Sequence, residues 1–247
     1  MFSAAADPSG VRLMINAVLF AGGYAAEACG TPGDEDDNGH ADCADPACAD
    51  AAACQSNGCP ALRVGITGGG FYHDELRVGL DAEPDITAER VDDCSPDTLA
   101  NYEVLIIYGN RAGNCREEAT LNAWVDAGGT LIGVPWVVGN NGSLDSLPVS
   151  GPRAGLGLAG YPVDVVDATS PLLTGVDFQP GDGECPLGPR PISLDPDCVH
   201  REAGALREGA RLVATVPGEP EPVMIASWDV GAGRGICIGY HYVTSDQ

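Results

Sequence analysis

The sequence contains no lysine, so its twelve basic residues are all arginines, against 36 acidic residues and a formal net charge of −24 at pH 7. A surface of this charge repels phosphate groups, which disfavours binding to nucleic acids or to anionic membrane surfaces. The same balance suits cation binding, high salt, or simply solubility. A coding sequence rich in G and C would also favour these residue types, so the missing lysine does not identify a partner.

Two cysteine patterns are missing as well. The ten cysteines include no CxxC pair of the zinc-binding type and no CxxCH haem-attachment motif. Ten is nevertheless a high and even number for a chain of 247 residues. We therefore expect disulfides, and with them an extracellular or cell-surface location.

No apolar run is long enough to insert into a membrane. The most apolar stretch, residues 11–29, is interrupted by Asn16 and by the Gly22-Gly23 pair, whereas a membrane span needs roughly twenty apolar residues. A signal peptide begins with basic residues, but here Asp7 precedes the first arginine, Arg12. We predict a helix whose broad apolar face must be buried, formed by Leu13, Met14, Val18, Leu19 and Phe20.

The chain divides into three zones by composition. Residues 1–25 contain the apolar stretch. Residues 26–60 are small, acidic and rich in cysteine, with no hydrophobic periodicity. From residue 61 to 247 the pattern is that of an ordinary folded domain.

This large domain is predicted to alternate strands and helices. Continuous apolar runs favour buried strands at 62–67, 102–110 and 130–138, and a shorter one is expected at 163–168. The segments between the first three strands have helical spacing: Ser95 and Pro96 predict the start of one helix, and another is expected at 117–127. Near-continuous apolar strands in β–α–β order predict an α/β fold, a mostly parallel sheet with helices on both faces. Two late apolar runs, 222–229 and 233–242, predict a β-hairpin.

The acidic segment that begins at Asp34 has the spacing of a calcium-binding loop. Side-chain oxygens recur at alternate positions, Gly39 permits a sharp turn, and the carbonyl of His40 stands where such loops use a backbone ligand. Ca²⁺ prefers six to eight hard oxygen ligands, and without an ion these carboxylates would repel one another. We predict one Ca²⁺ bound by Asp34, Asp36, Asn38, His40, Asp42 (directly or through water) and Asp45. The alternative is a solvated acidic linker.

Residues 29–54 resemble the calcium repeats of thrombospondin type 3 and dockerin domains, because no amphipathic helices flank the loop and Cys43 lies within it. Extracellular modules of this kind bind calcium at roughly 10⁻⁴–10⁻³ M, which is a structural affinity. The resemblance implies a small, irregular, disulfide-rich calcium-binding segment.

Five segments of the large domain, in this order, match a known family: RVGITGGGFYHDE (63–75), DTLANYEVLIIYGN (97–110), LNAWVDAGGTLIGVPW (121–136), SPLLTGVDF (170–178) and WDVGAGRGICIGYHY (228–242). On these segments, residues 61–247 resemble the class I glutamine amidotransferase-like fold, in particular its trehalose-utilisation-type branch. The resemblance implies a flavodoxin-like, doubly wound sheet.

The catalytic residues of that family are absent. Its catalytic members carry a cysteine nucleophile after the strand that matches 130–134, but Pro135-Trp136-Val137 stands there. They also carry a glutamate two residues after a late histidine. Here His241 matches the histidine, but Val243 occupies the position of the glutamate. Without nucleophile and orienting acid, amidotransferase activity is not expected.

A second candidate site is at the carboxyl edge of the sheet, where open α/β sheets bind ligands. His73 and Asp74 follow the first strand, and His241 matches a position near the same edge. They suit a metal or a carbohydrate ligand. The alternative is that His73 and Asp74 cap a helix and a loop.

Disulfides are expected between Cys94 and Cys115, which both follow strands, and between Cys185 and Cys198, which bracket a segment rich in proline and glycine. Cys237 lies in an apolar strand and suits either a disulfide or a buried thiol.

In the family the late strand is followed by a closing helix, whereas here the matching segment, residues 11–22, stands at the other end. This helix could close its own domain or that of a neighbouring copy in a head-to-tail array, and we expect the second, with the chain as one period of a longer repeated polymer. An ordinary N-terminal helix on a monomer is the alternative. The function expected is a non-catalytic extracellular structural module, one repeat or subunit of a filament. The alternative is a secreted hydrolase or carbohydrate-binding protein that uses His73, Asp74 and His241.

Overall fold

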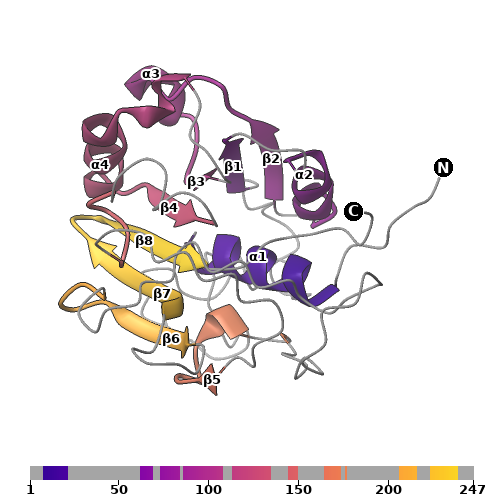
Figure 1. Cartoon of the computed structure of the whole chain (residues 1–247). Helices are drawn as coiled ribbons and strands as arrows, with labels where there is room; N and C mark the ends of the chain where they lie inside the picture. Colours follow the sequence, from indigo (N-terminus) through magenta and orange to yellow (C-terminus); the bar gives the residue numbers. More distant parts are fainter. Residues whose placement is uncertain are drawn as a thin grey trace, which may run out of the picture.

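The computed structural model of the chain describes residues 8–21, 62–68, 73–83, 86–107, 113–134, 144–149, 164–173, 176, 206–215 and 223–238. Their centre is an eight-stranded sheet with the strand order β2-β1-β3-β4-β8-β7-β6-β5 (Figure 1). The strands are β1 (Leu62–Thr67), β2 (Ile86–Arg90), β3 (Val104–Ile107), β4 (Thr130–Gly133), β5 (Asp164–Val165), β6 (Arg211–Thr215), β7 (Val223–Val230) and β8 (Gly233–Ile238).

The sheet is parallel on one side and antiparallel on the other. Strands β2, β1, β3, β4 and β8 pair in parallel, and β7, β6 and β5 continue the sheet in antiparallel fashion. Every residue of β3 and β4 is buried, because helices cover both faces of the parallel part. The predicted α/β fold with a mostly parallel sheet and a late hairpin, β7–β8, is confirmed.

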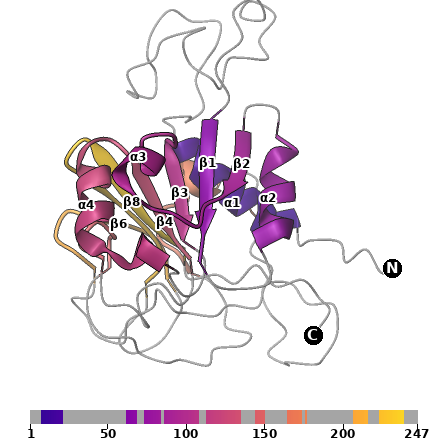
Figure 2. The ribbon, with the colours of Figure 1, turned by 90° about the horizontal axis from the view of Figure 1, so that it is seen from above.

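Helices lie on both sides of this sheet (Figures 1 and 2). One side carries α1 (Pro8–Ala21), α2 (His73–Asp81) and the 3₁₀ turn η4 (Pro171–Leu173); the other carries α3 (Pro96–Leu99), the 3₁₀ turn η3 (Gly113–Arg116) and α4 (Glu118–Asp126). Alternate residues of β3 point to opposite faces of the sheet and pack in the two hydrophobic cores. Val104 and Ile106 belong to the cluster under α1 and α2, whereas Leu105 and Ile107 belong to the cluster under α4.

The helix predicted at 11–22 is α1, which begins earlier, at Pro8, and ends at Ala21. Leu13, Met14 and Val18 are at most 2% exposed and belong to the core on this side of the sheet. The buried amide of Asn16 donates to the carbonyl oxygen of Leu172 at 3.1 Å. The apolar face is therefore buried, and its one polar residue is hydrogen-bonded.

The carboxyl end of α1 is held by β4 and β8. Thr130 Oγ1 donates to the Ala21 carbonyl at 3.1 Å, and Arg234 Nη1 donates to the Phe20 carbonyl at 3.0 Å. The Arg234 guanidinium also lies 4.2 Å from the centre of the Phe20 ring. A cation at this end of a helix complements the helix dipole. In this structure of one chain, α1 packs on the sheet of its own domain. Closure of a neighbouring copy by α1 stays a prediction.

The connection from β2 to β3 contains only one turn of helix, α3. Ser95 is its N-cap and Pro96 its first residue, as the sequence predicts. Instead of the Ser95 hydroxyl, the Asp93 carboxylate organises this end, because it accepts from Ser95 N at 3.0 Å, Ser95 Oγ at 2.8 Å and Thr98 Oγ1 at 2.8 Å. A single turn covers little of the sheet, and this short helix shapes the groove described below.

No helix among the described residues is long and apolar enough to cross a membrane. The cysteine-rich zone at 26–60 lies outside the described residues.

Candidate functional site

The residues predicted to bind calcium lie outside the described part of the chain, as do His241 and the Cys185–Cys198 pair. Within the described part, no group of three or more His, Cys, Asp or Glu side chains is placed to hold a metal ion. The calcium site therefore stays a prediction.

His73 and Asp74 form the start of α2, directly beyond the carboxyl end of β1. This is the edge of the sheet at which the sequence predicts them. Their backbone position is also what the capping alternative expects, so their role as ligands stays a prediction.

A disulfide joins two connections at this same edge. Cys94 follows β2 and Cys115 lies in η3, after β3, and the two sulfur atoms are bonded with a Cα–Cα distance of 4.8 Å. Both cysteines are almost fully buried, at 1% and 0% exposure. The predicted Cys94–Cys115 pair is confirmed.

Thr67, the last residue of β1, completes this cluster. It is buried, and its hydroxyl donates to Cys115 Sγ at 3.4 Å. The carboxyl ends of β1, β2 and β3 thus meet at a cross-link and a hydroxyl group. A disulfide sulfur is neither a proton carrier nor a nucleophile, so this cluster holds structure rather than supplying acid–base chemistry.

Cys237, in β8, is also disulfide-bonded. The sequence left open whether it is a thiol or a disulfide, and the structure has the disulfide. Its partner lies outside the described residues.

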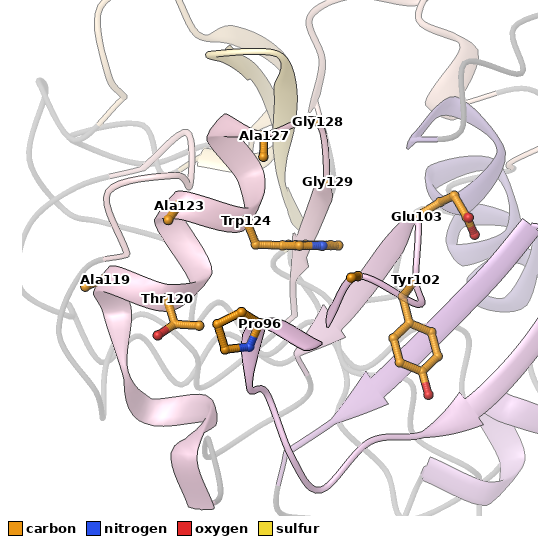
Figure 3. Close-up of a pocket in the computed structure, with 11 residues that line it drawn as sticks. Pro96, Tyr102, Glu103, Ala119, Thr120, Ala123, Trp124, Ala127, Gly128 and Gly129 are labelled. Atoms are coloured by element: carbon orange, nitrogen blue, oxygen red, sulfur yellow. The ribbon is translucent and has the colours of Figure 1, made fainter. Parts of the chain in front are cut away.

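A groove of about 730 Å³ lies beside α3 and α4, towards the amino-terminal ends of β3 and β4 (Figure 3). Its walls are mostly small apolar residues, and among its lining residues only Glu103 carries a charge. It is lined by Pro96, Ala100, Tyr102, Glu103, Ala119, Thr120, Ala123, Trp124, Ala127, Gly128 and Gly129.

The indole of Trp124 projects into this groove from α4 (Figure 3). Its Nε1 donates to the carbonyl oxygen of Leu99, the last residue of α3, at 3.1 Å. One ring face lies so close to Gly129 that a Cβ at that position would be 2.3 Å from Trp124 Cε2. The ring is therefore fixed by a hydrogen bond on its edge and by the backbone beneath it.

Tyr102 and Glu103 stand at the other end of the groove, with their polar atoms directed away from Trp124 (Figure 3). The Tyr102 hydroxyl donates to Glu89 Oε2 at 3.5 Å, and Glu103 Oε2 accepts from Arg63 N at 2.8 Å. Burial raises the pKa of Tyr102, and the charge of Glu89 raises it further. Few polar groups of the walls are therefore free to orient a small polar ligand.

The sequence did not predict this groove. Helical spacing predicts that Leu121, Trp124 and Val125 lie on one face of a helix. The structure buries the two aliphatic residues, whereas Trp124 is only partly buried and lines the groove. The available signal was the row of alanines four residues apart on the adjoining face, Ala119, Ala123 and Ala127, all of which are exposed. What the sequence could not show is that α3 and α4 pack so as to leave these alanines uncovered.

No family model and no curated protein matches the sequence. Solved structures do match. A cytoplasmic protein from Salmonella typhimurium LT2 is 11% identical, with a TM-score of 0.51 over 72% of this chain and 87% of that chain. A ThuA-like protein from Bacteroides uniformis is 11% identical, with a TM-score of 0.48 over 75% of this chain and 84% of that one. At such identities the first similarity supports the α/β fold and assigns no activity.

Proposed function

We propose that the chain is a non-catalytic structural module of an oxidising, extracellular environment, that disulfides and calcium stabilise it, and that its copies associate head to tail. The buried Cys94–Cys115 disulfide carries this proposal. Disulfides persist mainly outside the reducing cytoplasm, and this one occupies the edge of the sheet where an enzyme of this architecture would place reactive groups.

The sequence supports the non-catalytic part of the proposal. Pro135 replaces the family's nucleophile, and between it and Ser143 there is no cysteine, serine or threonine. Proline offers no nucleophilic group, so the acyl transfer of the resembled family has no starting point.

Calcium is assigned in this proposal to the loop from Asp34 to Asp45, whose ligand spacing was set out above. The bound ion would neutralise part of a chain with a net charge of −24. It would also order a zone that has no hydrophobic pattern with which to form a core.

Head-to-tail association would use α1. Residues 22–61 connect α1 to β1, and a segment of that length reaches at most roughly 130 Å when extended. Such a connection lets α1 close its own domain, as in this structure, or the same site on a neighbouring copy. An exchange of this kind between identical chains need not form a closed ring, and then produces filaments.

Light scattering and electron microscopy of the full chain, in calcium and in a chelator, test the proposal. We expect association that grows with protein concentration and with calcium. A compact monomer at every concentration would show that the head-to-tail part is wrong. Loss of a measurable turnover in the variants His73→Ala and His241→Ala would instead establish the hydrolase alternative.

A further inference from the structure

From the groove beside α4 we propose a docking site for an amphipathic helix of a partner protein, a helix with a basic polar face. This site lies at the opposite edge of the sheet from the disulfide cluster and is independent of the module function proposed above.

The shape of the groove suits a helix. The exposed residues Ala119, Ala123 and Ala127, four residues apart, form a row along α4 and its C-cap, about 12 Å long at a rise of about 1.5 Å per residue. Small side chains let a second helix approach closely, and the apolar anchors of a docked helix recur over a similar distance. Because α3 has only one turn, from Pro96 to Leu99, no helix of this chain's β2–β3 connection covers the row.

The chemistry of the walls favours a helix over a small polar molecule. Small-ligand sites combine apolar walls with several convergent polar groups. Here the indole N–H of Trp124 already donates a hydrogen bond to the Leu99 carbonyl oxygen. The polar atoms of Tyr102 and Glu103 point away from Trp124 (Figure 3). The remaining side-chain polar group of the walls, the Thr120 hydroxyl, contacts Glu117 at 3.5 Å. An apolar helix face needs few hydrogen bonds.

The walls are also pre-organised. Trp124 is held by a hydrogen bond at its edge and by Gly129 against its face, so docking would not have to order it. A rigid tryptophan at the centre of an apolar patch is a common anchor of protein interfaces.

The charges around the groove indicate the kind of partner helix that would bind there. Helices α3 and α4 contain the acidic residues Asp97, Glu118 and Asp126 and no basic residue, and Glu103 adds a further carboxylate. Arg63 lies 6.0 Å from the centre of the Tyr102 ring, so the carboxylates still outnumber the basic residue described there. These carboxylates attract a basic helix and disfavour an acidic segment of a second copy at this groove. The occupant is therefore a helix of another protein, with arginine or lysine opposite its apolar face.

A labelled peptide of about 18 residues, with leucine on one helical face and arginine and glutamine on the other, tests the proposal against the full chain at about 150 mM salt. The matched probe has the same composition but contains D-residues that prevent a helix. Two variants add the same charge: Ala123→Arg in the groove, and Val78→Arg on α2, where Val78 is 59% exposed on the other side of the sheet.

We expect saturable binding of the helical peptide, a loss of affinity of about tenfold or more in Ala123→Arg, and a change of less than about twofold in Val78→Arg. The peptide with D-residues should bind weakly and equally to all three proteins. Thermal melting checks that each variant folds, and Ala119→Arg replaces Ala123→Arg if the latter does not.

Equal losses in the two arginine variants, or equal binding of both peptides, would mean that only net charge is recognised and would overturn the proposal. No saturable binding of the helical peptide would overturn it too. A change in the solution mass of the chain on Ala123→Arg would identify the groove as a contact between copies instead.

Discussion

Gly129 leaves room for the indole of Trp124, since a Cβ there would lie 2.3–2.6 Å from three ring atoms. Gly129→Ala should therefore displace the indole and lower the free energy of unfolding by about 1–3 kcal/mol. Urea denaturation and tryptophan emission measure the two effects. The exposed neighbour Ala127, changed to serine, should stay within about 0.5 kcal/mol of the parent. If the Gly129→Ala variant had the stability and the tryptophan emission of the parent, the close contact between Gly129 and Trp124 would be wrong.

Tyr102 should ionise at higher pH than a free tyrosine, because burial and the Glu89 carboxylate both raise its pKa. The unfolded chain ionises this tyrosine near pH 10, so the folded chain holds the proton more tightly. The resulting stabilisation is complete below about pH 10 and is lost as the pH rises through the folded pKa.

Tyrosinate absorbance against pH measures this shift, and Tyr102→Phe identifies which of the seven tyrosines is responsible. Glu89→Gln should lower the pKa of Tyr102 only in part, since burial remains its largest cause. A Tyr102 that titrates like free tyrosine would contradict the contact with Glu89.

Local signals at single residues were readable from the sequence, and those that depend on distant neighbours were not. Ser95 and Pro96 mark the start of α3 because capping involves adjacent residues. The contact between Trp124 and Gly129 depends on the conformation of the chain between α4 and β4. The hydrogen bond from the Trp124 indole to the Leu99 carbonyl depends on where another helix, α3, ends. Neither can be derived from helical periodicity alone.

At the scale of elements, the Cys94–Cys115 disulfide ties the segment after β2 to η3. Removing it as the double variant Cys94→Ala, Cys115→Ala should lower the free energy of unfolding by about 2–4 kcal/mol, because the unfolded chain loses a constraint. Denaturant unfolding measures the loss. The exposed Val78→Ala serves as the control.

Mass spectrometry of unreduced peptides tests the wider framework. We expect most of the ten cysteines to be oxidised, with Cys185–Cys198 as the second pair. Six or more free thiols in the native protein would reject the oxidised framework, and with it the extracellular location.

Three strands of the parallel part, β1, β3 and β4, were predictable because they are continuous apolar runs, and the hairpin because β7 and β8 are joined by a short turn. The pairing of β6 with β7 and β5 was not, since the direction and order of pairing depend on residues far apart in the chain. The strand expected at 163–168 is only two residues long in the structure, β5 (Asp164–Val165). Its exposed position at the edge of the sheet gives its side chains little to pack against.

At the scale of the whole molecule, calcium should stabilise the chain. If the loop binds at roughly 10⁻⁴ M, calcium at tenfold excess over that value adds about 1.4 kcal/mol, or about 2–6 °C in melting temperature. Calorimetry in calcium and in chelator measures the shift. The variant Asp34→Asn, Asp45→Asn should melt alike in both. A parent protein whose melting and protease sensitivity ignore calcium would count against the site.

The anchoring of α1 also sets an order of events during synthesis. Helix α1 leaves the ribosome first, but Arg234, which binds the Phe20 carbonyl, lies 214 residues later. At typical translation speeds its docking site on β8 is completed roughly 10–40 s after α1 emerges. Throughout this interval the apolar face of Leu13, Met14 and Val18 lacks the complete sheet, because β8 has not yet been synthesised. A second chain that is further along in translation of the same messenger RNA already has that sheet complete. Exchange of α1 between copies would therefore be easiest during synthesis and slow once each domain has closed on its own α1.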